Sequence, residues 1–71
     1  MNQKQLIAIY QHGDFIGWFC HENTNVPRVY GTVDRARKVA SGLTAQSRQY
    51  TPVMPQFDGL KYRSMPLGYY R

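Results

Sequence analysis

Cysteine and acidic residues are scarce in this sequence of 71 residues. Its one cysteine, Cys20, cannot form a disulfide within the chain, which is usual in a reducing compartment, and we expect the protein in the cytoplasm. The four carboxylates are scattered, with no paired spacing for acid–base catalysis. Cys20 and His21 are neighbours on a predicted strand, so their side chains point to opposite faces and cannot form a nucleophile–base pair.

Sequence motifs for metal, phosphate-loop and dinucleotide binding are also missing. A metal site needs three or four converging ligands, and no such set can be assembled from this sequence. A chain this short buries only about 60% of its unfolded surface, which leaves little room for a water-free pocket. We therefore expect a protein with no catalytic residues, no metal and no cofactor.

Long apolar runs are absent too. No segment is long enough for a membrane span, and the N-terminal apolar stretch is too short for a signal peptide. The length allows one domain, residues 1–71, in which residues 58–71 form a basic and aromatic tail that could be flexible. We expect no membrane partner.

Basic residues dominate the second part of the chain. Lysine and arginine total nine against four acidic residues, for a net charge of +5. Residues 1–27 hold one lysine against two acidic residues, a net −1, whereas residues 28–71 hold eight basic residues against two acidic ones, a net +6. Such a basic half indicates an acidic partner, either nucleic acid or an acidic protein surface, although it would also serve solubility alone.

The segment QLIAIYQHGDFIGWFCH, residues 5–21, predicts a β-hairpin. Two β-prone runs flank a turn signal at His12-Gly13-Asp14. We take Gly13 and Asp14 as the central turn residues, so that Ile9 faces Trp18; a turn of another length would regroup the faces. The face that we expect in the core then carries Ile7, Ile9, Ile16, Trp18 and Cys20, and the other carries Leu6, Ala8, Tyr10, Phe15, Phe19 and His21.

A helix is predicted within RVYGTVDRARKVASGL, residues 28–43. Thr32 has the position of an N-cap, and Asp34 lies in the first turn, where a negative charge favours the helix dipole. Gly42 weakens the helix, which ends there or continues to about Gln49. We expect its apolar stripe to share one core with Ile7, Ile9 and Trp18; the stripe consists of Val33, Ala36, Val39, Ala40 and Leu43.

Shorter extended segments are predicted around the helix. Residues 27–31, PRVYG, form a third strand or an extended lead into the helix. Residues 50–57 contain two prolines and form an edge strand or an extended arm, and residues 60–63 can add a short strand. The predicted fold class is α+β: a small antiparallel sheet, made of the N-terminal hairpin plus one or two further short strands, with a single amphipathic helix packed on one face.

The candidate partner-binding residues are basic or aromatic. On a helical wheel Arg35, Arg37 and Lys38 fall on the solvent side, which is equally typical of a solvated helix face. Reversing these three charges together should leave the fold intact and weaken partner binding. The full set is Arg28, Arg35, Arg37, Lys38 and Arg48 around the helix, and Lys61, Tyr62, Arg63, Tyr69, Tyr70 and Arg71 in the tail.

The aromatic residues of the outer hairpin face leave two alternatives. Tyr10, Phe15 and Phe19 are exposed and can stack bases or anchor a protein contact. Alternatively, the C-terminal arm folds over them and makes a second small core, and we favour this arrangement for so short a chain. The aromatic residues of that arm are Tyr50, Phe57, Tyr62, Tyr69 and Tyr70.

Residues 28–43 resemble the strand-to-helix step of the ethylene-response-factor type of DNA-binding domain, also found in integrase arm-binding domains. The likeness is carried by Gly31-Thr32, Asp34, Ala36 and Ala40. It implies a three-stranded sheet that reads DNA. Residues 5–21 contain no Arg or Lys, unlike the sheet of that family.

In size, in the order of its predicted strands and helix, and in charge, the whole chain is similar to small bacteriophage host-takeover proteins, including inhibitors of host RNA polymerase. This resemblance implies a non-catalytic binding protein, encoded by a phage or mobile element, that occupies an acidic protein surface of host nucleic-acid machinery such as the transcription apparatus. One alternative is direct DNA or RNA binding through the basic face. Another is a structural or assembly module that acts as an oligomer.

Overall fold

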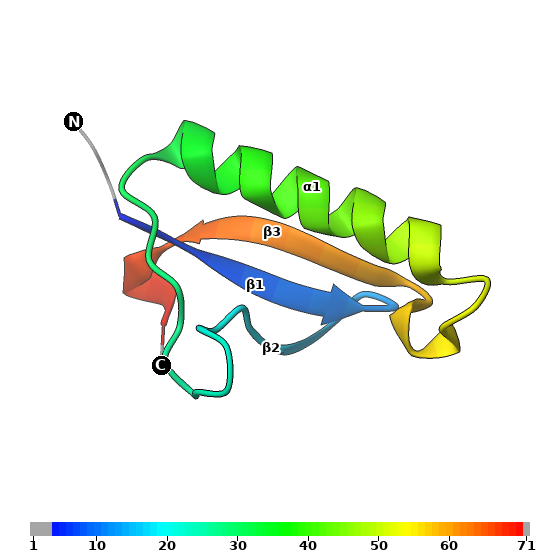
Figure 1. Ribbon diagram of the computed structural model, residues 1–71. Helices are drawn as coiled ribbons and strands as arrows, with labels where there is room; N and C mark the ends of the chain where they lie inside the picture. The colour runs from blue at the N-terminus through cyan, green and yellow to red at the C-terminus, as the bar shows by residue number, and fades with distance from the viewer. Residues whose placement is uncertain (1–3, 71) are drawn as a thin grey trace.

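Three antiparallel strands and one long helix form the protein (Figure 1). The structure, a computed structural model, describes residues 4–70. The strands are β1 (Gln5–Gln11), β2 (Asp14–Trp18) and β3 (Leu60–Pro66), and the helix is α1 (Val33–Tyr50). Two short 3-10 helices, η1 (Pro55–Phe57) and η2 (Leu67–Tyr69), flank β3. The predicted α+β class, an antiparallel sheet with a single helix on one face, is confirmed.

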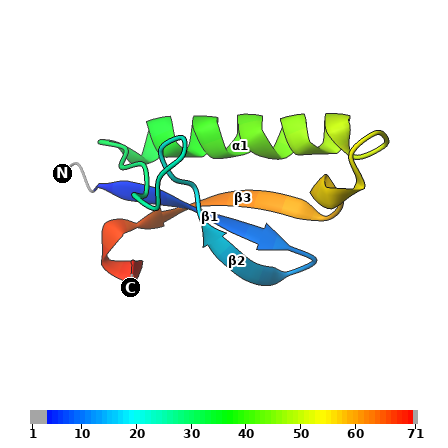
Figure 2. The same cartoon turned by 60° about the horizontal axis from the view of Figure 1, so that its bottom comes forward.

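β1 is the central strand, and it is covered on both faces. The strand order is β2-β1-β3, and α1 lies along β3 on the side away from β2 (Figures 1 and 2). Leu6, Ile7 and Ala8 are at most 1% exposed. Because successive side chains of a strand point to opposite faces, three buried residues in a row require cover on both sides. Ile7 is buried as predicted. Leu6 and Ala8 lie on the outer face, as predicted, and they are buried there as well.

The register with β3 shows which side chains of β1 face the helix. Ile9 pairs with Tyr62, and Tyr62 lines a groove beneath α1 together with Leu43. Ile7 and Ile9 therefore point toward α1, and Ala8 and Tyr10 point away from it.

The hairpin turn lies one residue earlier than predicted. Gln11 pairs with Asp14, so His12 and Gly13 are the two turn residues. Their φ angles are +52° and +88°, and the two-residue turn that matches the twist of a hairpin needs positive φ at both positions. Glycine adopts positive φ at little cost, and histidine is found there more often than most side chains. The prediction, which placed Asp14 in the turn, was wrong.

A β-bulge at Ile16 shifts the register a second time. Tyr10 pairs with Phe15, but Ala8 pairs with Trp18, which leaves one extra residue on β2. Phe15 and Trp18 are three positions apart and would point to opposite faces of a regular strand; the bulge brings them to one face. Trp18 lies on the face opposite α1, so its predicted place in the helix-side core is wrong. Ile16, also predicted in the core, is 53% exposed.

Phe19 and Cys20, which follow β2, also differ from the predicted grouping. Phe19 was expected on the outer face, but its ring lies 6.1 Å from that of Tyr62, on the helix side. Cys20 is half-buried, and its thiol lies 3.3 Å from the backbone carbonyl of Trp18. The bulge accounts for this exchange, because one extra residue reverses the side on which every later side chain falls.

α1 begins at the predicted N-cap. The Thr32 hydroxyl accepts a hydrogen bond from the Arg35 backbone N–H at 3.2 Å. Of the predicted apolar stripe, Ala36 and Ala40 are buried, and the remaining members, Val33, Val39 and Leu43, are half-buried. The helix passes Gly42 and ends at Tyr50, close to the longer of the two predicted ends.

Hydroxyl groups of α1 bind the outer edge of β3. The Tyr62 N–H donates to Thr44 Oγ1 at 2.9 Å, and the buried Ser47 hydroxyl lies 3.3 Å from the Leu60 carbonyl. Unpaired edge groups of a sheet otherwise attract a further strand. These bonds satisfy the edge, and they hold the polar second half of α1 against the sheet.

Two predicted extended segments have different outcomes. Residues 27–31 form the extended lead and not a strand, with isolated bridges at Gln5–Tyr30 and Cys20–Pro27. Residues 50–57 contain no strand, because the chain turns after α1 and then forms η1 with Pro55 at its start. The expected edge strand or arm there was wrong. β3, predicted over residues 60–63, is longer and pairs with the whole of β1.

Candidate functional site

The face of the sheet opposite α1 carries a group of aromatic and basic side chains, and we call it the open face. All three strands and the segment after β3 contribute to it, while α1 lies on the other side of the sheet (Figure 2). The residues that define it are Tyr10, Phe15, Trp18, Lys61, Arg63, Met65, Tyr69 and Tyr70.

Four aromatic rings form a continuous row on the open face. The centroid distances are 5.8 Å for Tyr10–Phe15, 5.2 Å for Phe15–Trp18 and 5.8 Å for Trp18–Tyr70, and each pair meets edge to face. Such pairs add about 0.5–1.5 kcal/mol each beyond the area that they bury. The Tyr10 hydroxyl also donates to Met65 Sδ at 3.7 Å. The row, Tyr10–Phe15–Trp18–Tyr70, is therefore built before any ligand arrives.

The C-terminal segment joins the row and leaves much of it exposed. Tyr70 packs on Trp18, and Tyr69 lines the same shallow hollow as Phe15. Even so, Phe15 is 50% exposed, Tyr69 61% and Tyr70 46%. The structure thus combines the two alternatives left open by the sequence, since the arm contacts the hairpin aromatics without burying them.

The charge of the open face is positive. Lys61 pairs with Tyr10 and Arg63 with Ala8, so both cations share the face of the aromatic row. Both are exposed. Asp14 pairs with Gln11, whose side chain belongs to the helix side. Within residues 4–70, the strand positions of this face hold two cations and no carboxylate, which favours an anionic partner.

The remaining predicted cations lie outside the strands. Arg35, Arg37, Lys38 and Arg48 are exposed on α1. Two of them adjoin the cations of β3, because Arg37 lines a hollow with Arg63 and Arg48 lines one with Lys61. Arg28 is half-buried, and its guanidinium carbon lies 5.6 Å from the centre of the Phe19 ring. This cation–π contact gives Arg28 a structural role.

Arg71 lies outside the described residues. The predicted partner-binding set is consequently divided between the sheet and the helix, which adjoin at the edge of β3.

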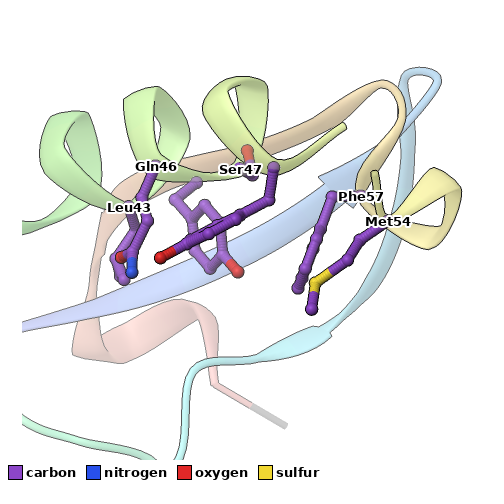
Figure 3. Close-up of a pocket in the computed structure, with 7 residues that line it drawn as sticks. Leu43, Gln46, Ser47, Met54 and Phe57 are labelled. Carbon is purple, nitrogen blue, oxygen red and sulfur yellow. The ribbon is translucent and has the colours of Figure 1, made fainter. Parts of the chain in front are cut away.

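A groove of about 320 Å³ opens beneath the second half of α1 (Figure 3). Leu43, Gln46 and Ser47 reach it from the helix, and Met54 and Phe57 from the segment that follows. Tyr62, predicted at the partner surface, lines this groove, and its pairing with Ile9 places its side chain on the helix side. Burial raises the pKa of the Tyr62 phenol above its ordinary value of 10.0.

Tyr62 is expected to make the protein sensitive to alkaline pH. Because its pKa is higher in the folded than in the unfolded chain, its contribution to the free energy of unfolding is complete below about pH 10 and is lost as the pH rises through the raised value. Tyr62→Phe removes this dependence. Urea unfolding of both proteins at about pH 8 and about pH 11 should show a larger alkaline loss for the wild type. Equal losses would mean that the phenol is solvated in the folded state.

Two further features of the described residues bear on function. No group of three or more His, Cys, Asp or Glu side chains within residues 4–70 is placed to hold a metal ion. In the same range, no helix is both long and apolar enough to cross a membrane.

Sequence reasoning placed Tyr10 and Phe15 on the outer face of the hairpin, where the structure has them, but it missed the rest of the open face's centre. It assigned Trp18 to the core and gave Met65 no role. One signal was present, because an isolated glycine within a strand often accompanies a bulge, and Gly17 is adjacent to Ile16.

The sequence and the structure were also compared with known proteins. A scan against protein-family models finds no match, and searches of curated proteins and of solved structures find none either. The chain is therefore assigned to no family, and its function has to be argued from the open face.

Proposed function

We propose that this protein is a non-catalytic nucleic-acid-binding protein that contacts its ligand with the open face. The observation that carries the proposal is the placement of Lys61 and Arg63 beside a partly exposed row of aromatic rings. Cations neutralise phosphates, and flat aromatic rings stack on bases, so a surface that combines them matches both parts of a nucleotide.

The charge pattern supports nucleic acid over an uncharged or basic partner. In the described part of the chain, the charged residues at strand positions of the open face are both cations. The nearest strand carboxylate, Asp14, belongs to the other face. An acidic protein would satisfy the same charges. Nucleic acid also matches the aromatic rings, because it supplies a flat base next to each phosphate.

A second candidate function rests on α1. Arg35, Arg37 and Lys38 are exposed on its outer side, with Arg48 in its last turn. This basic helix face suits an acidic protein surface, such as one on host transcription machinery including RNA polymerase. The two functions use different charged residues, on β3 and on α1, so paired variants can separate them.

The test compares two double variants with the same change of charge. Lys61→Ala/Arg63→Ala alters the open face, and Arg35→Ala/Lys38→Ala alters the helix; all four side chains are exposed, so both variants should fold. Arg37 is left unchanged because it lines a hollow together with Arg63. Binding to labelled single-stranded and duplex oligonucleotides is measured by fluorescence anisotropy. We expect the open-face variant to lose about tenfold or more in affinity, because charged contacts to phosphate are lost, and the helix variant to change much less.

Two results would contradict the proposal. One is a loss of affinity that follows the helix variant instead of the open-face variant. The other is no binding of the wild type to any oligonucleotide at about 50 mM salt, where electrostatic contacts are strongest. In the second case, capture of a bacterial protein that persists after nuclease treatment and is lost with Arg35→Ala/Lys38→Ala would support the helix candidate.

A further inference from the structure

We infer that the open face binds single-stranded nucleic acid, in preference to a duplex, by stacking about two bases on its exposed rings. The inference rests on the proposed function and adds the class of ligand. Three features of the open face support it: the small number of its cations, the orientation of its rings and their mutual packing.

The cations of the open face are too few for a duplex reader. Proteins that bind duplex DNA tightly neutralise about 6–10 phosphates. Within residues 4–70 the open face carries Lys61 and Arg63, and Arg37 and Arg48 of α1 adjoin them in hollows at the edge of β3. Even these four cations together are fewer than a tight duplex binder uses. Affinity must therefore come mainly from contacts other than phosphates.

The rings supply such contacts only to unpaired bases. In a duplex each base is stacked on its neighbours and shows only its edges in the grooves, whereas a single strand can turn the flat side of a base outward. Phe15, Tyr69 and Tyr70 expose about half of their surface. Phe15 has no hydrogen-bonding group in its side chain to read a base edge, so stacking is the interaction that it offers.

The geometry of the row limits the number of stacked bases. Successive rings are inclined at 72°, 66° and 64°, so two neighbours in the row cannot both lie flat against parallel bases. Among four rings in a row, no more than two can then be parallel. Phe15 and Tyr70 flank the half-buried Trp18 and are its more exposed neighbours. They are the rings that we assign to base stacking.

The rings are held in place before binding. Trp18 packs between Phe15 and Tyr70, and the Tyr10 hydroxyl is bonded to Met65. Rings that are already fixed lose little side-chain entropy when a ligand binds, so more of the stacking energy contributes to affinity.

The first experiment uses the fluorescence of Trp18, the only tryptophan in the chain. The full-length protein is titrated with three probes of about 12 nucleotides: an oligothymidine, a duplex of the same length, and an abasic strand with the same number of phosphates. We expect oligothymidine to change the emission of Trp18 and to bind about tenfold or more tightly than either other probe. The logarithm of its affinity should fall with the logarithm of salt concentration at a slope of about −1.4, for two phosphate contacts on a single strand.

The second experiment removes the rings one at a time. Phe15→Ala and Tyr70→Ala should each reduce affinity for oligothymidine by about tenfold, and Phe15→Tyr should retain it. Tyr50→Ala is the matched control, because Tyr50 is 41% exposed but lies at the end of α1. Far-ultraviolet circular dichroism establishes that each variant is folded before binding is measured.

The outcomes separate the inference from the function on which it rests. If the duplex or the abasic strand binds as tightly as oligothymidine, and the affinity still depends on Lys61 and Arg63, the stacking inference is wrong and the proposed function stands. If Tyr50→Ala weakens binding as much as Tyr70→Ala, the assigned rings are wrong. If no probe binds, both proposals fail.

Discussion

Ile7→Ala is expected to lower the free energy of unfolding by about 2–5 kcal/mol, the range for truncating a fully buried isoleucine. Ile7 is 0% exposed and lies in the central strand, on the side facing α1. A domain of this size has a total stability of only a few kcal/mol. The variant should therefore be largely unfolded at room temperature, which urea titration followed by circular dichroism would measure.

Ile16→Ala is the matched control for this substitution. It removes the same atoms from the same hairpin, but Ile16 is the extra residue of the bulge and is 53% exposed. Its loss should stay below about 1 kcal/mol, as for surface substitutions in general. The regular hairpin register expected from the sequence places both residues on one core face. Similar losses for the two variants would favour that register and contradict the bulge.

Gly59→Ala is expected to lower stability by about 1–3 kcal/mol, because two costs add at this position. Gly59 has a φ of +70°, which alanine adopts poorly. An added Cβ would also lie 2.5 Å from Cε1 and Nδ1 of the His12 ring. The two turns are tied together here, because the His12 N–H donates to the Gly59 carbonyl at 3.1 Å.

Two further variants identify the cause of that loss. Gly42→Ala lies within α1, where a Cβ meets nothing within 4 Å, so it should raise stability by about 0.5–1 kcal/mol. His12→Ala/Gly59→Ala removes the clash and keeps the backbone strain, and it should be more stable than the sum of its single changes predicts. Thermal unfolding followed by circular dichroism gives these comparisons. An unchanged melting temperature for Gly59→Ala would show that the two turns do not meet as described.

The helix was predictable because its signals are local. Thr32, Asp34 and the apolar spacing lie within a few residues of one another, and each acts on the adjacent backbone. Its end was harder to predict, since the second half of α1 is polar. Thr44 and Ser47 hold that half by bonding to β3, which is distant in sequence.

The presence of a hairpin could be predicted from the sequence, but its strand register could not. Alternating apolar residues around a glycine indicate two paired strands wherever the turn begins. The turn lies one residue earlier than predicted, which shifts the pairing by two residues and leaves each side chain on its predicted face. The bulge adds one residue and reverses the face of every later side chain, so Trp18 was put on the wrong face.

The set of residues on the open face depends on the bulge and on the turn after β3 that brings the C-terminal segment back to the sheet. Lys61 and Arg63 were named as candidates from the charge of the tail, but their neighbours could not be known without the pairing of β3 with β1. Tyr70 reaches Trp18 only because η2 turns the chain back after β3. Composition therefore indicated a basic and aromatic binding protein, while the location of the face required long-range contacts.

The most direct test of the account is to map the ligand on the protein by nuclear magnetic resonance. Oligothymidine is added to the isotopically labelled full-length chain, and the change in each backbone amide signal is recorded. We predict that the changes fall on Phe15, Trp18, Lys61, Arg63 and Tyr70. Signals of Arg35 and Lys38 on α1 should stay in place. Changes concentrated on those two helix residues, with the sheet signals unmoved, would contradict the assignment of the open face as the binding surface.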